Sequence, residues 1–279
     1  MPWKIESIPL RLRDAAYNNA AAAPDGVVLL ARLAEESKAL RARYAATMDL
    51  PYGPRERMRL DIFPGTTRGS PCLVYLHGGY WQMNSREIFA VLGAGVAAHG
   101  WSVAVVGYTL APEANLCTIV GEVGAALDWL VDNRGRYGIT GPLILAGSSA
   151  GGTLAALALE HPAVGGAMAI SGIFELAPLR GTYLDAKLKL TDTEIEDLSP
   201  LRRPVCPKRL VIAHGSDELP AIIANAAALH ALRRATGAPT IFLSVEHADH
   251  FSILESLRRH DSPLTDALLK IHTPIGETE

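Results

Sequence analysis

The chain is poor in several features that mark particular classes of protein. It has three cysteines in 279 residues, Cys72, Cys117 and Cys206, an odd number at wide spacings. Such cysteines form neither a disulfide framework nor the closely paired ligands of a zinc site, and they indicate reduced thiols in a cytoplasmic protein. No apolar run reaches the length of a membrane span, and the segment "WSVAVVGYTLA" has the size of a buried strand.

An excess of charge of one sign is also lacking. The 26 Lys and Arg residues and 29 Asp and Glu residues are interspersed and leave a net charge of −3. This balance argues against a nucleic-acid or membrane-surface partner. The segment "MPWKIESIPLRLRD" carries charges where a signal peptide needs an apolar core. We therefore expect a cytoplasmic protein that acts on a small molecule, and we leave a homodimer open.

Short apolar runs alternate with helical segments over most of the chain. Several runs are apolar throughout, as is typical of strands buried on both faces of a parallel sheet. The expected strands cover residues 57–63, 72–77, 102–108, 142–148, 166–171, 209–215 and 240–246. The expected helices cover residues 25–46, 85–99, 117–135, 150–160, 219–236 and 251–271. The alternation predicts an α/β fold in one domain, residues 1–279, with a mostly parallel central sheet and helices on both faces.

Two segments depart from this alternation. Residues 1–50 are expected to form a helical N-terminal extension, since the helical repeat in it is followed by the proline-marked break "LPYGP". Residues 174–207 are longer and more charged than the other connections and contain no clean strand. Insertions of this kind often cover a functional site, so we expect a lid over residues 174–207.

The most informative segment is "PLILAGSSAGGTLAALALE", in which a strand-like run becomes a helical one at "GSSAGG". A phosphate-binding loop is one interpretation, but Thr153 occupies the lysine position and the G-x-G-x-x-G spacing is missing. The second interpretation is a tight turn in which the glycines only let the helix pack closely on the sheet. The third is a nucleophile elbow, G-x-S-x-G, which selects Ser149 rather than Ser148 because Gly147 and Gly151 flank it two residues away on either side.

Partners for Ser149 are expected where other strands end, because ligands of doubly wound folds lie at the carboxyl ends of the strands. Asp217 follows "LVIAHGS" and His250 follows "FLSVEHAD". The chain order Ser149, Asp217, His250 is that of an α/β-hydrolase catalytic triad. The three positions together are far more specific than G-x-S-x-G alone, so we predict these residues as nucleophile, acid and base.

Alternatives exist for the acid, the base and a metal. Glu218 adjoins Asp217 and is the alternative acid, although the "HGSD" register favours Asp217. Asp249 adjoins His250, but neighbouring side chains on an extended loop diverge. His247 is the alternative base, and the loop-end position favours His250. The "HADH" segment offers only two imidazoles and no third ligand, so neither a metal nor a cofactor is expected.

The segment "HGGYW", which follows the strand "CLVYL", predicts an oxyanion hole. Acyl transfer needs N–H donors aimed at the developing negative charge, and glycines after a strand let the backbone turn its N–H groups into the site. Gly79, Tyr80 and Ala150 are the expected donors, and Gly78 is a weaker candidate. A glycine-rich packing loop is the structural alternative. His77 is interpreted as a residue that holds this loop and not as a base.

These motifs together resemble one family. The segments "YGPRERMRLDIFP", "HGGYW", "YTLAPEANL", "GSSAGG", "HGSDELP" and "DHF" are similar to those of the α/β-hydrolases of the hormone-sensitive-lipase-like group, especially their arylformamidase (kynurenine formamidase) branch. The resemblance covers roughly residues 52–255 and implies an α/β-hydrolase fold. Lipase-like members have a third glycine where this chain has Tyr80. The lid segment and the first 24 residues carry no matching motif.

The resulting hypothesis is a serine hydrolase that cleaves a small, formyl-like acyl amide or ester of an aromatic substrate. Trp81 and Phe174 are expected to bind the aromatic group, since both lie near the predicted site and stacking favours a flat partner. The structural alternative is that Tyr80, Trp81 and Phe174 are simply packed under the lid. A broad-specificity short-chain carboxylesterase would use the same catalytic residues. A hydrolase-fold binding protein without activity is the alternative from another class, and such proteins usually lack a triad member.

Overall fold

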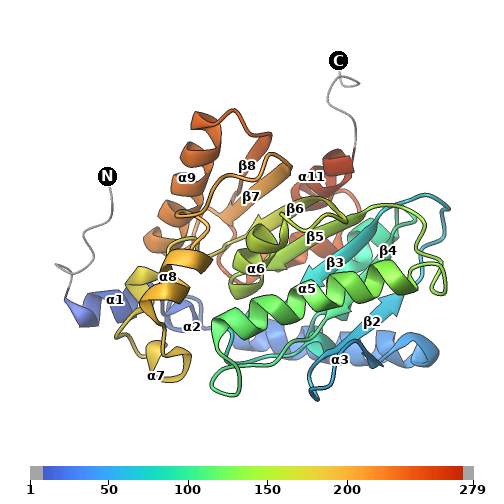
Figure 1. Ribbon diagram of the computed structural model, residues 1–279, viewed down its shortest axis with the longest axis horizontal. Coiled ribbons are helices and arrows are strands. Elements are labelled where there is room, and N and C mark those ends of the chain that lie inside the picture. The colour runs from blue at the N-terminus through green and yellow to red at the C-terminus, as the bar shows by residue number, and fades with distance from the viewer. Residues whose placement is uncertain (1–8, 273–279) are drawn as a thin grey trace.

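The computed structural model describes residues 9–272, which form an eight-stranded sheet between two layers of helices (Figure 1). The strands are β1 (Leu50–Pro51), β2 (Arg59–Phe63), β3 (Cys72–Leu76), β4 (Ser102–Val106), β5 (Leu143–Ser148), β6 (Val164–Ile170), β7 (Arg209–Gly215) and β8 (Thr240–Val245). Their order is β1-β2-β4-β3-β5-β6-β7-β8, and only β1 and β2 pair antiparallel with their neighbours. The predicted α/β fold with a mostly parallel sheet is confirmed.

The apolar strands are buried on both faces because alternate side chains enter different cores. In β3, Cys72, Val74 and Leu76 belong to one hydrophobic cluster, whereas Leu73 and Tyr75 belong to the other. This alternation follows from the period of two along a strand. It explains why the strands read as continuously apolar runs in the sequence.

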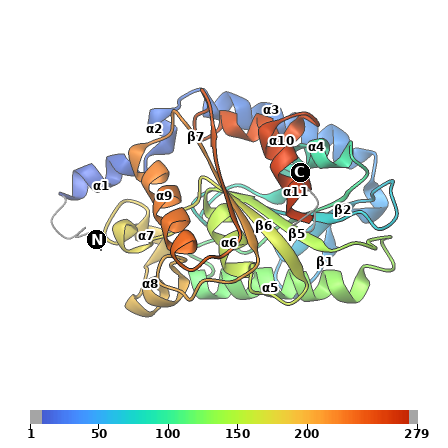
Figure 2. The ribbon, with the colours of Figure 1, turned by 90° about the horizontal axis from the view of Figure 1, so that it is seen from above.

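Helices cover both faces of the sheet. The α-helices are α1 (Leu10–Ala16), α2 (Asn19–Ala22), α3 (Gly26–Ala42), α4 (Ala94–Ala97), α5 (Leu116–Asn133), α6 (Ala150–Ala158), α7 (Asp185–Leu188), α8 (Asp192–Leu198), α9 (Pro220–Ala235), α10 (Glu255–Arg258) and α11 (Pro263–His272). Short 3₁₀ helices are η2 (Ala45–Thr47), η3 (Arg86–Ile88), η4 (Ala90–Gly93), η5 (Ala177–Leu179) and η6 (Ser252–Leu254). Viewed from above, α3, α4, α10 and α11 lie on one side of the sheet and α5 on the other (Figure 2). Among residues 9–272, no helix has both the length and the apolarity that crossing a membrane requires.

Two expected helices are interrupted in the structure. The segment 85–99 divides into η3, η4 and α4, and a Cβ atom at Gly95 in α4 would lie 2.5 Å from the carbonyl oxygen of Leu257. The close packing of α4 against the C-terminal segment therefore requires glycine at this position. The segment 251–271 divides into η6, α10 and α11, because Pro263 starts a new helix at its first position.

The N-terminal extension is tied to the sheet by a buried ion pair. The Asp61 carboxylate on β2 is fully buried, and it lies 2.7 Å from Arg41 Nε on α3 and 3.3 Å from Arg86 Nε. Two guanidinium groups thus compensate the cost of burying this charge. Residues 1–8 of the expected extension lie outside the described part of the chain. Within residues 9–50, the extension contains α1, α2 and α3.

The extension also contacts the predicted lid segment, residues 174–207, which contains η5, α7 and α8. The Tyr183 N–H donates to Asp14 Oδ1 at 2.9 Å, and the Tyr183 hydroxyl donates to the Tyr17 carbonyl at 3.1 Å. Segments far apart in the sequence therefore meet over the same end of the sheet, as Figure 1 shows for α1, α2 and α7.

Candidate active site

Ser149 occupies the sharp turn between β5 and α6. Its φ of 54° and ψ of −120° are a strained conformation for a residue with a side chain. A Cβ atom at Gly147 would lie 2.1 Å from the Gly151 carbonyl oxygen, and one at Gly151 would lie 2.0 Å from the Leu76 carbonyl oxygen. Neither position therefore admits a side chain, which is the requirement that the G-x-S-x-G spacing predicts.

The loop after β3 packs directly against this turn. A Cβ atom at Gly78 would lie 2.8 Å from the Ser148 carbonyl oxygen and 3.2 Å from Ser149 Cβ. Gly79 has a φ of 121°, and a Cβ atom there would lie 2.3 Å from the Met83 carbonyl oxygen. The two glycines let the loop turn sharply beside Ser149, where a larger residue would push it away.

The predicted oxyanion donors are backbone N–H groups next to Ser149. Within residues 9–272, the N–H groups of Gly79 and Tyr80 have no hydrogen bond to a protein acceptor. Ala150 is the first residue of α6, and the first N–H groups of a helix have no acceptor within it. Unpaired N–H groups near a helix N-terminus favour a negatively charged oxygen. Their role as an oxyanion hole stays a prediction.

His250 lies in the same region and is held by a carboxylate. Its Nδ1 is 2.8 Å from Glu218 Oε2, and both side chains are buried. The other oxygen of Glu218 accepts hydrogen bonds from the Ser171 hydroxyl at 2.5 Å and the Gly215 N–H at 2.7 Å. Glu218 is therefore fixed on three sides, and its orientation leaves His250 Nε2 as the ring nitrogen available for proton transfer.

Glu218, and not the predicted acid Asp217, contacts His250 in the structure. Asp217 is exposed, its carboxylate accepts from the Ser216 hydroxyl at 2.8 Å, and its N–H donates to the Ala248 carbonyl at 3.0 Å. That backbone bond holds Asp217 at the outer side of the turn after β7. The next residue then points inward, and its longer side chain reaches the imidazole.

The other candidates for acid and base lie apart from this arrangement. Asp249 Oδ1 accepts from the N–H groups of Phe251 and Ser252, each at 2.8 Å. Burial acts to raise the pKa of Asp249, but these hydrogen bonds outweigh it and hold the pKa below its usual value. His247 is exposed and has a φ of 56°. Neither residue lines the cavity that contains Ser149 and His250.

Ser149 and His250 line one cavity of about 280 Å³. Gly78, Gly79 and Tyr80 form part of its wall, together with Ser148 from the elbow. Its remaining lining is largely apolar and includes Leu30, Phe89, Leu184 and Leu254. Met83 and Tyr183 also line it and are about half exposed, at 52% and 48%, so they lie at its opening. The cavity suits an apolar ligand group beside a polar reactive end.

The two aromatic residues predicted to bind substrate do not line this cavity. Trp81 and Phe174 are both 0% exposed and pack within the larger hydrophobic core. The Phe174 ring packs so closely on Gly172 that a Cβ atom there would lie 2.5 Å from it. Neither side chain is therefore placed to contact a ligand in this cavity, because position near a catalytic motif does not determine which way a side chain points.

Several residues that line the cavity come from segments without a recognisable motif. Asn18, Asn19 and Val27 belong to the N-terminal extension, and Tyr183 and Leu184 belong to the predicted lid segment. No sequence signal identifies the first group, since the extension matches no motif of the resembled family. Residues 174–207 are distinguished in the sequence by their length and charge, and their role as a lid stays a prediction.

His77 is held by ring stacking and hydrogen bonds at the start of the loop after β3, residues 77–81. Its ring is stacked 4.3 Å from the Tyr108 ring and 6.0 Å from the Phe89 ring, and its Nδ1 is 2.8 Å from the Gly78 carbonyl oxygen. Tyr108 also donates from its hydroxyl to the His77 carbonyl at 2.6 Å. Burial lowers the pKa of His77 to about 4, so the ring is neutral at pH 7. His77 is therefore a structural residue.

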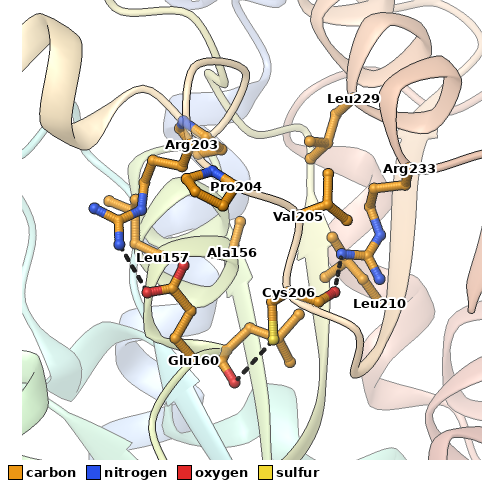
Figure 3. A pocket seen from close by; sticks show the side chains of 12 residues that line it. Ala156, Leu157, Glu160, Arg203, Pro204, Val205, Cys206, Leu210, Leu229 and Arg233 are labelled. Atoms are coloured by element: carbon orange, nitrogen blue, oxygen red, sulfur yellow. Dashed lines mark hydrogen bonds and ion pairs between the residues drawn. The ribbon is translucent and has the colours of Figure 1, made fainter. Parts of the chain in front are cut away.

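A second, smaller cavity lies between α6 and α9 and has a different character (Figure 3). Its volume is about 30 Å³, and its lining contains neither serine nor histidine. Arg203 pairs with Glu160 at 2.7 Å on one side, and Arg233 donates to the Cys206 carbonyl at 3.0 Å on the other. It holds about one water molecule at most and offers no nucleophile with a base. Elsewhere, residues 9–272 contain no group of three or more side chains suited to hold a metal ion.

The fold, the strained serine turn and the histidine–carboxylate pair define the site of an α/β-hydrolase. The model of the α/β-hydrolase fold family matches residues 73–251, and the chain belongs to this family. It is also 30% identical over 258 residues to the kynurenine formamidase of Salmo salar, a match that covers 86% of each protein. The resemblance to the arylformamidase branch is thereby confirmed.

Solved structures agree with this assignment of the fold. A candidate thioesterase from Silicibacter sp. has a TM-score of 0.79 and 26% identity, covering 92% of this chain and 98% of its own. Esterase LipW from Mycobacterium marinum has a TM-score of 0.72 at 19% identity, covering 98% of this chain and 99% of its own. At that identity the second likeness concerns the fold alone.

The buried neutral state of His77 predicts a pH-dependent stability. Between about pH 6.5 and pH 4 the unfolded chain binds a proton at this residue that the folded chain does not bind. The free energy of unfolding should therefore fall as the pH falls through this window, by about 3 kcal/mol in total. Urea unfolding of the wild type and of His77→Phe, which keeps the ring stack, should show a smaller loss in the variant.

The matched control is His99→Phe, since His99 is exposed. Its loss of stability between pH 7.5 and pH 4.5 should equal that of the wild type. If His77→Phe also matched the wild type, His77 would not be the buried neutral group described here.

Proposed function

We propose that this α/β-hydrolase is a serine enzyme that removes a small, formyl-like acyl group from an aromatic amide or ester. The observation that supports this most strongly is a single cavity lined by a serine in a strained turn, by a histidine held by a buried carboxylate, and by a loop with unpaired N–H groups. The likeness to kynurenine formamidase of Salmo salar supports the formyl group and the aromatic substrate. No cofactor takes part in the proposed reaction.

In the first half-reaction, Ser149 Oγ attacks the acyl carbon while His250 Nε2 takes its proton. Glu218 accepts the Nδ1 hydrogen of His250 and stabilises the imidazolium that forms. The N–H groups of Gly79, Tyr80 and Ala150 stabilise the negative oxygen of the tetrahedral intermediate. His250 then gives its proton to the leaving nitrogen or oxygen, the bond to the acyl carbon breaks, and an acyl-serine remains.

In the second half-reaction, water replaces the leaving group. His250 takes a proton from the water as its oxygen attacks the acyl carbon of the acyl-serine. The intermediate is stabilised by the same N–H groups, and His250 returns the proton to Ser149 Oγ as the acyl–oxygen bond breaks. An aryl formamide would thus yield formic acid and an aryl amine, and the enzyme would be restored.

The apolar part of the cavity supports an aromatic leaving group. Leu30, Phe89, Leu184 and Leu254 provide apolar contact, and Tyr183 provides a partly exposed ring at the opening. Aromatic substrates are therefore expected to bind through these residues and not through Trp81 or Phe174. A broad short-chain carboxylesterase stays the second candidate, because the same lining would accept the alcohol part of many esters.

Exchange of the two neighbouring carboxylates tests the proposed triad. In Glu218→Gln, the side-chain oxygen can still accept from Ser171 and Gly215, which leaves an NH₂ group facing His250 Nδ1. The imidazole must then carry its proton on Nε2 and cannot take the proton of Ser149. We expect kcat to fall on the order of 10³- to 10⁴-fold, measured with an aryl ester under saturation.

Asp217→Asn is the matched control at the adjacent position. Asp217 is exposed, its carboxylate accepts from the neighbouring Ser216 hydroxyl, and the substitution keeps its backbone bond to Ala248, so kcat should stay within about twofold of the wild type. A larger loss in Asp217→Asn than in Glu218→Gln would show that Asp217 is the acid after all.

A series of acyl groups on one aryl leaving group tests the formyl-like specificity. A cramped acyl site discriminates against each methylene that does not fit by roughly 1–3 kcal/mol. We expect kcat/KM to fall from formyl to acetyl to butyryl, and we expect formanilide to be cleaved as an amide. A flat or rising profile as far as hexanoyl, with no cleavage of formanilide, would favour the carboxylesterase.

A further inference from the structure

One wall of the active-site cavity is formed by the first turn of α3 and the segment that follows His250. Val27 and Leu30 of α3 line the cavity together with Phe251 and Leu254, and all four side chains are apolar. These four residues are called the α3 wall below. Half of the α3 wall therefore comes from the N-terminal extension, which carries no motif of the hydrolase family.

Direct contacts connect the α3 wall to the base. The centre of the Phe251 ring lies 5.5 Å from that of the His250 ring, at an interplanar angle of 88°. Gly26, the first residue of α3, packs on the Phe251 ring, since a Cβ atom at Gly26 would lie 2.3 Å from Phe251 Cδ2. Further along α3, Arg32 pairs with Glu255 at 2.8 Å. The first turn of α3 is thus separated from His250 by a single aromatic ring.

The proposed reaction determines which part of a substrate meets this wall. His250 must lie within hydrogen-bond reach of the leaving atom to which it gives its proton, whereas the carbonyl oxygen faces the N–H groups of Gly79 and Tyr80. The group attached to the leaving atom therefore extends along the surface next to His250. Phe251 is partly exposed and lines the cavity there, so this surface begins the α3 wall.

We propose that the α3 wall is the subsite for the leaving group and that it takes an uncharged aryl group. Val27, Leu30, Phe251 and Leu254 provide apolar contact, and none of them can compensate a charge removed from water. This subsite rests on the proposed acyl transfer and goes beyond it in two respects. It places the leaving group against one wall and the acyl group away from it, and it makes the N-terminal extension select the leaving group.

A charge placed on the α3 wall tests where the leaving group lies. Val27 is 67% exposed, so Val27→Lys should fold as the wild type does. The experiment measures kcat/KM on 4-carboxyphenyl formate and on phenyl formate, which differ only in a carboxylate on the leaving ring. We expect Val27→Lys to raise the ratio of the first to the second about two- to fivefold over the wild type, the size of an exposed ion pair. The comparison between variants cancels the intrinsic reactivity of the two esters.

The matched control is Val28→Lys, which adds the same charge to the same helix. Val28 is 71% exposed but does not line the cavity, because successive residues of a helix point about 100° apart. Its lysine should leave the ratio close to that of the wild type. Equal increases in the two variants, or no increase in Val27→Lys, would overturn the proposal.

Leu30→Ala separates the leaving-group side of the cavity from the acyl side. The smaller side chain would widen the α3 wall, so kcat/KM on 2-naphthyl formate should rise relative to phenyl formate by about fivefold or more. The ratio of phenyl acetate to phenyl formate should stay that of the wild type. A purely structural role for Leu30 would slow all three esters alike, and a gain on the acetate instead would place the acyl group against this wall. Either result would overturn the proposal.

Failure of the proposed function would be visible separately. If the wild type cleaved aryl acetates but not aryl formates, the formyl-like specificity would fail. The same ratios, measured with 4-carboxyphenyl, 2-naphthyl and phenyl acetates, would then decide the place of the leaving group. If the wild type cleaved none of these esters, the proposed function and the subsite would both be wrong.

Discussion

Two backbone turns approach each other at the carboxyl ends of β3 and β5, and the geometry of the site depends on that approach. A Cβ atom at Gly151 would lie 2.0 Å from the Leu76 carbonyl oxygen, and one at Gly78 would lie 3.2 Å from Ser149 Cβ. Only glycine permits backbones to come so close. The contact brings the predicted nucleophile beside N–H groups that have no acceptor within residues 9–272, so the proposed nucleophile and the proposed oxyanion donors arise from one packing constraint.

The other walls of the cavity are held by an ion pair and by hydrogen bonds of residues outside the proposed catalytic group. Asp61 binds Arg41 of α3 and so ties the N-terminal extension to the sheet, while the Tyr17 carbonyl accepts from the hydroxyls of Tyr80 and Tyr183. The extension, the loop after β3 and the segment after β6 therefore meet at a single carbonyl oxygen. Substrate selection should depend on this junction, whereas the acyl-transfer step should depend on the glycine contact.

The sequence predicts two kinds of feature: regular elements with a periodic apolar pattern, and turns whose backbone conformation requires glycine. Alternating apolar runs predicted the parallel sheet, and G-x-S-x-G predicted the turn at Ser149 because glycine is obligatory there. Prediction from the sequence fails where the role of a residue depends on the direction of its side chain. Asp217 and Glu218 are adjacent carboxylates, and the one that faces His250 is Glu218, whose other oxygen accepts from the Ser171 hydroxyl and the Gly215 N–H. Trp81 was likewise expected in the cavity, but its indole is buried in the core.

The central claim is that Ser149 is an activated nucleophile, and covalent labelling with a fluorophosphonate tests it most directly. The serine oxygen would attack phosphorus and expel fluoride, which requires the same base and the same N–H groups as acyl transfer. Peptide mass spectrometry of the labelled wild type should locate one adduct, on Ser149, and Glu218→Gln should label much more slowly. An adduct on Ser148, or no adduct under conditions that label other serine hydrolases, would contradict the account.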